Sequence, residues 1–501
     1  MQLAFDVSSW TANLRRMFHQ DRLDSVSRCT TWLLASGLLM VSVACQSTRL
    51  APQGTPSPPA GSLSENLESH VRFLASDALR GRDTGTQESL RAAGYLAEVL
   101  RKAGAEPAGD GGGWYQVMDL QGVDLTRPPK LTLAGEAAES LECVHGADYR
   151  LMSGIGGVQN ATLVTMNDPS VLPEVHGSGP VALFIDLDDP AAGFRLARDR
   201  RDELAAIADI VLFAGRPGVG KTRPLPEHLV GRPEAPASIM LNGPALERVR
   251  SGELDRVSFE LAGEEPVAAL NVVGKIPGVG TPDRPDLADE VVVLTAHYDH
   301  VGVSPDKSAE DRIFNGANDD ASGVAVVLEL ARLFGEGEAP ARTLVFALVT
   351  AEEQGLLGST YFVQNPPVPL EDIVCNVNFE MLGQPDEGAG GFGKMFLTGF
   401  ERSNLGPSWA AMELPIQADP YPQLQLFFRS DNLAFVRQGI PGHSISTGGM
   451  VEHYHEVTDE TDTLNWPHME ICAEVSYQAL VPVVSGALDP AWLPGGNPNS
   501  E

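Results

Sequence analysis

Residues 291–346 read VVVLTAHYDHVGVSPDKSAEDRIFNGANDDASGVAVVLELARLFGEGEAPARTLVF. The β-branched run at the start predicts a strand that delivers His297 and Asp299 at its end. A polar loop rich in Gly and Asn then presents Asp319, and a helix is expected to follow. Ligand-type side chains that gather where a strand ends indicate a metal site at the edge of an α/β sheet.

The spacing of the first two polar residues has a geometric consequence. His297 and Asp299 are two residues apart, so they lie on the same side of an extended chain. We therefore expect the Asp299 carboxylate to hold the second imidazole nitrogen of His297, as the outer partners of metal-binding histidines do.

Three later segments add further ligand-type side chains. Two acids follow one expected strand, one acid interrupts a buried strand, and an aromatic–imidazole pair lies in the segment EHYHEVTDETDTLN (452–465). These residues are Glu352, Glu353, Glu380, Tyr454 and His455. Because the two adjacent acids diverge, we expect one to bind metal and the other to face a water molecule.

The carboxylates of this set favour metal binding. Buried carboxylates are costly without cations, so a cluster of Asp319, Glu353 and Glu380 calls for a divalent metal. Three carboxylates and two imidazoles suit two ions that share a bridging carboxylate, and mixed N and O ligands favour zinc. Each short pattern alone is typical of helix capping or a solvated surface. Their order along the chain and their positions at strand ends favour the metal site.

The remainder of the chain separates into segments of different character. Residues 266–490 alternate strands and helices, and helical patterns at 63–135 are expected to cover the same sheet. Between them, residues 136–265 carry short strands and predict a small β-rich inserted domain. A flexible tail is expected at 491–501. The strands expected in the 266–490 segment are 290–297, 342–350, 373–381, 395–399 and 442–447, and the helices are 321–335, 355–364, 430–438 and 467–481.

The first 44 residues are typical of an export signal. Basic residues precede an apolar run, Trp32 to Ala44, that is too short to span a bilayer. The break Ser42-Val43-Ala44-Cys45 resembles a bacterial lipobox, in which Cys45 would carry the lipid and 45–62 would be a flexible tether. We expect a periplasmic or cell-envelope lipoprotein attached to the membrane through Cys45, with an ordinary secreted protein as the alternative.

Charge and proline placement exclude two classes of partner. The formal net charge of −32 at pH 7 is unsuited to nucleic acid, whose phosphates need a basic face. GRPGVGKT (215–222) matches a phosphate-loop pattern, but that loop needs a helix that begins at its lysine. Pro224 and Pro226 would break such a helix, so no nucleotide is expected.

The ordered motifs TAHYDHVG, NGANDDASGVAVVLELAR, TAEEQGLLGS, NVNFEMLG, SDNLAFVRQGIP and YHEVTDETDTLN resemble the co-catalytic (binuclear) zinc aminopeptidase family. That family includes secreted bacterial leucyl aminopeptidases, glutamate carboxypeptidases and glutaminyl cyclases. The likeness covers about residues 265–485, and the insertion is similar in position to a protease-associated domain. It implies an α/β fold with a mixed, largely parallel sheet sandwiched by helices (zinc exopeptidase, phosphorylase/hydrolase-like).

The resemblance also implies a ligand set for two Zn²⁺ ions. His297 and Glu380 would bind one ion. Glu353 and His455 would bind the other, and Asp319 would bridge the two. The peptide bond that follows Asp319 is expected to be cis.

Three further residues receive catalytic roles from the same resemblance. Glu352 would be the general base that takes a proton from the attacking water and returns it to the leaving amine. Asp299 would orient His297, and Tyr454 would donate a hydrogen bond to the oxyanion.

Two positions depart from the family pattern. Most members carry Asp where this chain has Glu380, at a carboxylate that in aminopeptidases also holds the free amine of the substrate. Asn432 stands where members often have His, and it is expected to affect support of the site rather than ligation. His300 and His453 are interpreted as supporting or structural residues.

The chain is therefore expected to be a zinc-dependent exopeptidase. The leading hypothesis is an aminopeptidase that hydrolyses N-terminal residues from peptides with a water activated by the metal ions. A carboxypeptidase or a glutaminyl-cyclase-like enzyme is an alternative within the same fold, although the intact metal-ligand set favours two metals over the cyclase. A non-catalytic peptide-binding lipoprotein is an alternative of another class, and the complete set of catalytic-type residues argues against it.

Overall fold

The computed structural model describes residues 61–500, apart from gaps at 126, 137, 174–178, 190–191, 194–195, 198–199, 216–227, 233–235, 262–264, 305 and 449–451. The expected export signal and Cys45 lie outside the described residues, as does the phosphate-loop pattern beyond Gly215. Within the described part of the chain, no helix has the length and apolar character of a membrane span.

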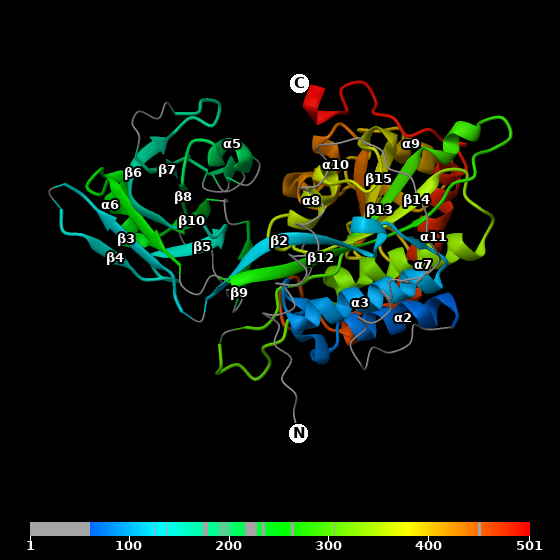
Figure 1. The fold of residues 1–501 in the computed structure, drawn as a ribbon, viewed down its shortest axis with the longest axis horizontal. Coiled ribbons are helices and arrows are strands. Elements are labelled where there is room, and N and C mark those ends of the chain that lie inside the picture. Colours follow the sequence, from blue (N-terminus) through cyan, green and yellow to red (C-terminus); the bar gives the residue numbers. More distant parts are fainter. Residues whose placement is uncertain are drawn as a thin grey trace, which may run out of the picture. The chain divides into compact units, whose positions relative to one another are not determined.

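The larger of two sheets has ten strands in the order β17–β16–β18–β15–β13–β14–β12–β2–β9, with β1 paired to β12 (Figure 1). Their bounds are β1 (Glu106–Pro107), β2 (Tyr115–Asp124), β9 (His228–Gly231), β12 (Glu265–Ile276), β13 (Val291–His297), β14 (Thr343–Val349), β15 (Ile373–Glu380), β16 (Met395–Leu397), β17 (Ile416–Ala418) and β18 (Gly442–Ser446). The strands expected from 290 to 447 are therefore confirmed to within two residues at each end.

This sheet mixes parallel and antiparallel pairs. Strands β18, β15, β13 and β14 run parallel, as does the edge pair β16–β17, whereas β16 is antiparallel to β18 and β12, β2 and β9 continue the sheet antiparallel. The expectation of a largely parallel sheet is thus wrong on the β12 side. The physical reason is the connection: β2 and β12 are joined through the smaller sheet and not by a crossover helix, which parallel neighbours need.

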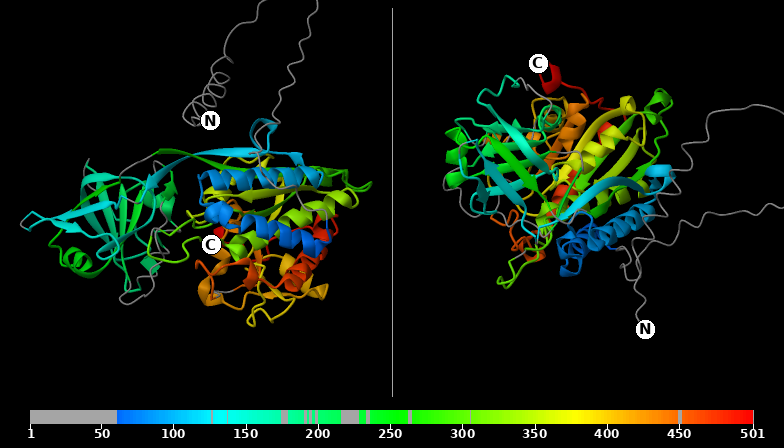
Figure 2. Two further views of the ribbon diagram at one scale, coloured as in Figure 1. Left: turned by 90° about the horizontal axis from the view of Figure 1, so that it is seen from below. Right: turned by 60° about the vertical axis from the view of Figure 1, so that its left-hand side comes forward.

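Helices pack against both faces of the larger sheet (Figures 1 and 2). Val292 and Leu294 of β13 join one core with helices α2 (Leu63–Leu74), α3 (Gln87–Lys102), α7 (Gly323–Glu336) and α11 (Trp466–Val484). The alternate residues Val291 and Val293 join a second core with α8 (Leu357–Gln364) and α10 (Asn432–Arg437). This alternation is the period-2 pattern of a strand that is buried on both faces. The mixed α/β fold is confirmed.

The smaller sheet has eight strands in the order β4–β3–β11–β6–β7–β8–β10–β5. It contains β3 (Lys130–Ala134), β4 (Leu141–Cys143), β5 (Tyr149–Ser153), β6 (Val158–Met166), β7 (Val181–Ile185), β8 (Ile210–Ala214), β10 (Ala237–Leu241) and β11 (Arg256–Glu260). Helix α5 (Arg201–Ala205) and helix α6 (Gly243–Arg250) accompany it, and its apolar residues form cores of their own. The sheet begins at Lys130, ahead of the expected boundary at residue 136.

The end of the chain packs against the larger sheet's helical layer. Trp492 donates a hydrogen bond from Nε1 to the carbonyl of Gly439 (2.7 Å), and Asn499 donates to the carbonyl of Val436 (2.6 Å). The expectation of a flexible tail at 491–501 is therefore wrong for these residues, because their polar groups are paired with backbone next to α10.

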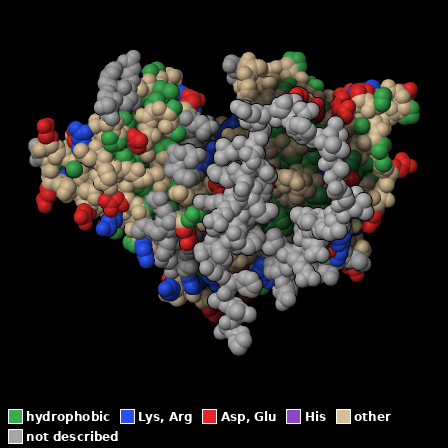
Figure 3. Space-filling view, viewed as in Figure 1, with side chains coloured by type: hydrophobic (Ala, Val, Ile, Leu, Met, Phe, Trp, Pro, Cys, Tyr) green, Lys and Arg blue, Asp and Glu red, His purple; other side chains and the backbone are tan. Residues whose placement is uncertain are grey.

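Charged side chains are spread over the face of the molecule shown in Figure 3. Acidic groups occur at several separate places on this face and do not gather in a single patch. The chain has a net charge of −32, but the acidic side chains on this face are not concentrated in one binding surface.

Candidate metal centre

Three strand ends bring the candidate ligands to one edge of the larger sheet. His297 is the last residue of β13, Glu380 is the last residue of β15, and Glu353 follows the end of β14. Strand β13 pairs in parallel with both β14 and β15, with His297 opposite Val349. Because parallel strands end at the same edge, these side chains meet there.

Asp319 arrives on the short segment Ala317–Ser322 that precedes α7, in which Asp319 and Asp320 have non-helical backbone angles. The Asp459 carboxylate accepts hydrogen bonds from the backbone N–H groups of Asn318 (2.9 Å) and Asp319 (3.0 Å). Asp320 accepts hydrogen bonds through Oδ1 from the N–H groups of Gly323 (3.1 Å) and Met381 (2.9 Å). The Asp319–Asp320 bond is cis, as expected. Asp320 is therefore occupied with backbone, while Asp319 faces the site.

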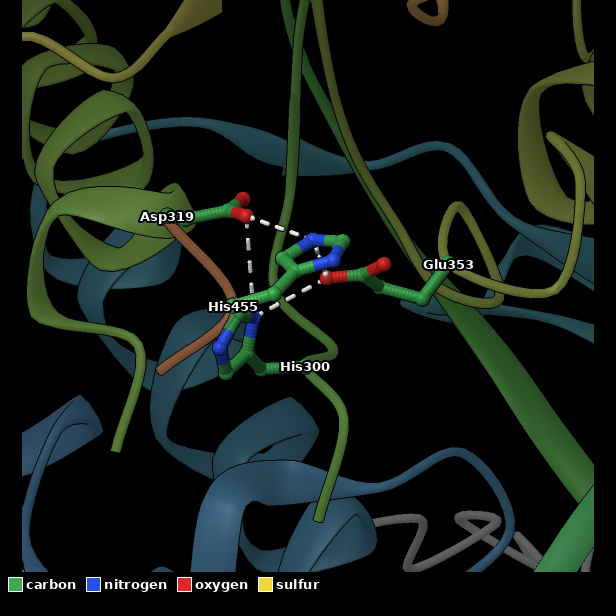
Figure 4. A group of neighbouring side chains, drawn as sticks. All are labelled: His300, Asp319, Glu353 and His455. Atoms are coloured by element: carbon green, nitrogen blue, oxygen red, sulfur yellow. Dashed lines mark ion pairs between the residues drawn. The ribbon is translucent and has the colours of Figure 1, made fainter. Parts of the chain in front are cut away.

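Four side chains form the first ligand group: His300, Asp319, Glu353 and His455. His455 Nε2 lies 3.0 Å from Asp319 Oδ2 and 3.0 Å from Glu353 Oε1. His300 Nδ1 lies 3.0 Å from the same Glu353 oxygen. Figure 4 shows that the four groups point at one another from separate segments.

The second ligand group lies on the other side of Asp319. His297 Nε2 is 3.2 Å from Asp319 Oδ1 and 3.3 Å from Glu380 Oε1. Asp319 therefore directs one carboxylate oxygen to each group. Asp320 also has an oxygen within reach of this group, and its two hydrogen bonds from backbone N–H groups are both to Oδ1. Asp319 is the better bridge because its two oxygens face the two groups.

The spacing of these atoms fits zinc. Four ligands at about 2.0–2.1 Å around a tetrahedral Zn²⁺ stand about 3.3 Å apart. The N···O separations of 3.0–3.3 Å in the two groups match that edge. The nitrogen and carboxylate donors are those that zinc prefers. The residues present therefore fit a zinc site with a shared carboxylate.

Electrostatics in the site also call for a cation. Burial raises the pKa of Glu352 well above its usual value, and the neighbouring Glu380 and Glu353 carboxylates add to this rise. Burial alone would lower the pKa of His455, but Glu353 and Asp319 raise it to about 9. In the absence of metal, protons on Glu352 and His455 supply the positive charge that the clustered carboxylates require.

Asp299 acts on the acidic pair through its side chain. Its Oδ1 accepts a hydrogen bond from the N–H of Glu352 (3.2 Å) and its Oδ2 one from the N–H of Glu353 (3.4 Å). His297 Nδ1 instead hydrogen-bonds the backbone carbonyl of Asp299 (3.1 Å), and the carboxylate is 3.8 Å away. The expectation that this carboxylate holds His297 is therefore wrong, because backbone amides at the end of β14 occupy it.

A pocket opens next to the two ligand groups. Asp319, Glu352 and Glu380 contribute carboxylates to its lining. Tyr454 also lines it and stacks on His455, with ring centroids 3.9 Å apart and an interplanar angle of 18°. The remaining lining residues are Met381, Phe396, Thr398, Leu426, Arg429, Ser430, Ser444, Ser446 and Gly448.

Sequence reasoning missed the role of Arg82. This buried guanidinium donates hydrogen bonds to the carbonyls of Leu74 (2.6 Å), Tyr298 (2.8 Å), Asn315 (2.5 Å) and Gly316 (3.0 Å). It thereby ties the segment after α2 to two of the segments that carry ligands, those of His297 and Asp319. Arg82 lies in the segment GRDTG (81–85), and this pattern carries no signal for partners more than 200 residues away.

The other histidines and Asn432 have different positions. His300 is part of the first ligand group. It therefore lies among the candidate metal ligands, whereas a supporting or structural position was expected for it. His453 is half-buried and its Nδ1 lies 2.9 Å from the Thr458 hydroxyl. Asn432 lies outside both ligand groups and accepts a hydrogen bond from the Ser444 hydroxyl (2.9 Å).

Known proteins resemble part of this chain. Residues 271–480 match the model of peptidase family M28. A probable zinc metalloprotease from Pyricularia oryzae is 41% identical over 128 residues, which are 25% of this chain and 22% of that protein. An aminopeptidase from Pseudomonas aeruginosa is 34% identical over 173 residues, which are 32% of this chain and 29% of that protein. The chain thus spans less than a third of the length of these curated relatives.

A solved structure shares the fold. An aminopeptidase from Aneurinibacillus sp. strain AM-1 superposes with a TM-score of 0.53 at 20% sequence identity. The superposition covers 84% of this chain and 93% of that one. The similarity therefore extends beyond the segment that carries the motifs.

Proposed function

We propose that the chain, which matches the model of peptidase family M28 over residues 271–480, is a zinc-dependent aminopeptidase that removes N-terminal residues from peptides. The observation that carries the proposal is the arrangement around Asp319. One of its oxygens faces His297 and the other faces His455, and Glu352 lines the adjoining pocket.

Two zinc ions are proposed for the two ligand groups. His297 and Glu380 would hold one ion, Glu353 and His455 the other, and Asp319 both. When bound, zinc supplies a Lewis acid for the scissile carbonyl and lowers the pKa of water. His300 lies against Glu353 and is proposed to steady that carboxylate, as outer partners of metal ligands do.

Glu352 is proposed as the general base. Its backbone is fixed by the Asp299 carboxylate, and its own carboxylate lines the pocket. A carboxylate in this position can accept a proton from the attacking water. The same group can then return the proton to the leaving amine.

Tyr454 and Glu380 are proposed to hold the two ends of the reacting group. Burial raises the pKa of Tyr454 well above its usual value, so its hydroxyl stays protonated and can donate to the oxyanion. Glu380 also lines the pocket and would accept hydrogen bonds from the N-terminal ammonium of the substrate. An N-terminal amine held there gives the aminopeptidase direction.

The proposal is tested with the zinc-loaded enzyme and its Glu352→Gln variant on a panel of aminoacyl-anilides. We expect kcat/KM to fall by about 10²–10⁴-fold in the variant while its zinc content stays equal to that of the wild type. A chelator should abolish activity in both the wild type and the control. The matched control is Glu371→Gln, an exposed glutamate outside the pocket, which should behave as the wild type.

The alternatives predict other products. A carboxypeptidase would release C-terminal residues from peptides that are blocked at the N-terminus. A glutaminyl cyclase would convert an N-terminal glutamine without releasing a residue. If the fully zinc-loaded protein removed no N-terminal residue from any member of a mixed peptide library, the aminopeptidase assignment would be wrong.

The smaller sheet and the N-terminal segment extend the proposal. We propose that the smaller sheet is a protease-associated-like inserted domain, which its position between β2 and β12 supports. The lipobox-like segment 42–45 supports export with a lipid on Cys45. Metabolic labelling with a radioactive fatty acid tests the second point, since a Cys45→Ser variant should lose the label.

A further inference from the structure

One basic side chain lines the otherwise acidic pocket. Arg429 shares the pocket lining with Asp319, Glu352, Glu380 and Tyr454. It is half-buried, and no hydrogen bond or ion pair of its guanidinium is found among the described residues. Burying part of an unpaired cation next to a reaction site is costly unless something of opposite charge binds there.

The backbone holds Arg429 firmly at this place. Its N–H donates to the carbonyl of Leu426 (3.0 Å), and the Asn432 side chain donates to the carbonyl of Phe427 (3.0 Å). The next residue, Ser430, donates its hydroxyl to Glu380 and accepts a hydrogen bond from Asn378 (2.7 Å). Arg429 is thus anchored through its neighbour to a ligand of the metal centre.

The acids of the site do not neutralise Arg429 once metal is bound. Two zinc ions would balance the charges of Asp319, Glu352, Glu353 and Glu380. Asp431 is buried two residues away, but no ion pair joins it to Arg429 in the described part of the chain. The guanidinium therefore keeps its positive charge toward the pocket.

The wall of the pocket offers a second donor. The Thr398 hydroxyl lines the same pocket and accepts a hydrogen bond from the N–H of Ser444 (2.9 Å). Its own hydrogen is then available to an acceptor in the pocket. A planar guanidinium with a neighbouring hydroxyl donor suits a carboxylate.

We propose that Arg429 binds a carboxylate of the substrate, so that the enzyme prefers peptides with a negative charge close to the scissile bond. This inference rests on the proposed function and names its substrate class. The carboxylate has two sources: the side chain of an acidic N-terminal residue, or the C-terminus of a dipeptide. In both cases Glu380 would hold the ammonium group of the substrate and Arg429 would hold its carboxylate. Each charge of the substrate would thus lie beside a protein group of opposite charge.

Two hydrolysis comparisons separate the sources. Glutamyl-anilide against glutaminyl-anilide tests the side chain, and Leu-Ala against Leu-Ala-amide tests the C-terminus. We expect the wild type to prefer the charged member of at least one pair by about tenfold or more, as a charge-assisted hydrogen bond supplies. Arg429→Met should reduce that ratio to near one, and Arg429→Lys should restore part of it.

Binding measurements keep the test independent of turnover. On the zinc-loaded Glu352→Gln background, calorimetry compares glutamic acid α-amide with glutamine α-amide, and Leu-Ala with its amide. The charged ligand of the preferred pair should bind about tenfold more tightly, and Arg429→Met should remove the difference. The control is Arg437→Met, an exposed arginine on α10, which should keep it.

The outcomes distinguish the two proposals. Equal hydrolysis and equal binding of both members of each pair, or a preference that survives in Arg429→Met, would overturn the role of Arg429 and leave the aminopeptidase intact. No hydrolysis of any anilide or dipeptide, with the binding preference present and lost in Arg429→Met, would overturn the peptidase and keep carboxylate binding. Thermal unfolding of each variant confirms that it is folded.

Discussion

Glu380 lies among partners that fit the length of its side chain. Its Oε1 lies 3.3 Å from His297 Nε2, and its Oε2 accepts hydrogen bonds from the Ser430 hydroxyl and from the Asn378 amide (3.2 Å). Both oxygens therefore have defined positions. The additional methylene relative to the usual aspartate is accommodated by Ser430, which is itself held by Asn378 (2.7 Å).

The Glu380→Asp variant, which restores the common family residue, should bind zinc less well. The shorter side chain would move the carboxylate back by one C–C bond, about 1.5 Å. It would then lose its contact either with the zinc ion that His297 would bind or with the Ser430 hydroxyl. We expect one of two zinc-binding steps to weaken by about 10–100-fold in a titration against a competing chelator. Ser430→Ala keeps the length of Glu380 and should weaken the same step less. Equal zinc affinity in wild type and Glu380→Asp would contradict this account.

The segment Ala317–Ser322 carries Asp319, which faces both ligand groups. Gly316 precedes it with a φ of +57°, and a Cβ at this position would lie 2.4 Å from the Asp319 carbonyl and 2.6 Å from the His300 ring. A side chain here is thus excluded by backbone conformation and by contact. Because both neighbours belong to the first ligand group, the glycine sets how closely they approach.

Gly316→Ala should therefore reduce metal binding as well as stability. We expect a loss of about 1–3 kcal/mol in the free energy of unfolding, and weaker zinc binding because Asp319 and His300 must move. The matched control is Gly111→Ala, at a φ of +60° with nothing within 4 Å of the added Cβ. It carries the conformational cost alone, so its zinc affinity should match the wild type. Equal effects of both variants on zinc binding would refute the contact argument.

The elements that sequence reasoning located are those with a local signal. The β-branched runs of β13 and β14 and the apolar stripe of α7 have clear periods, and their ends fall within two residues of expectation. The antiparallel partners β2 and β12 were missed because their pairing joins residues about 150 apart, and no local pattern reports it. The same limit applies to Asp299, whose partners are amides 53 and 54 residues later. The candidate ligands could be predicted because each lies in a short motif. The groups that hold these ligands in place are distant in the chain and leave no local pattern.

At the scale of the whole molecule, stability depends on groups that are buried without charge. His443 of β18 is buried, and its Nδ1 hydrogen-bonds the carbonyl of Thr398 (2.8 Å). Burial lowers its pKa to about 4, and burial also lowers the pKa of His468 in α11 to about 4. Both side chains are thus neutral in the folded protein at pH values where an unfolded histidine is charged.

The protein should therefore lose stability on acidification. Since the folded pKa lies below the unfolded value of about 6.5, stability from His443 is complete above pH 6.5 and is lost as the pH falls toward 4. The full effect of this side chain is about 3 kcal/mol. In His443→Asn, the fall of Tm between pH 6.5 and 4.5 should be shallower than in the wild type, whatever the absolute Tm. Zinc content is measured in the same samples, and an unchanged slope would contradict the assignment.

Metal removal should have the largest effect on the whole molecule, because the ligands connect its separate parts. Asp319 precedes α7, Glu380 ends β15 and His455 lies ahead of α11, so the two ions would join three segments that pack in one core. Without them, the carboxylates of Glu352, Glu353 and Glu380 remain together at the end of the sheet. At zinc concentrations about 100 times Kd, each ion contributes about 2.7 kcal/mol. We expect a chelator to lower Tm by about 5–10 °C, and two equivalents of zinc per chain to restore both Tm and activity. Recovery that is complete at one equivalent would contradict the two-ion site, and an unchanged Tm after verified zinc removal would show that the ions do not hold the fold.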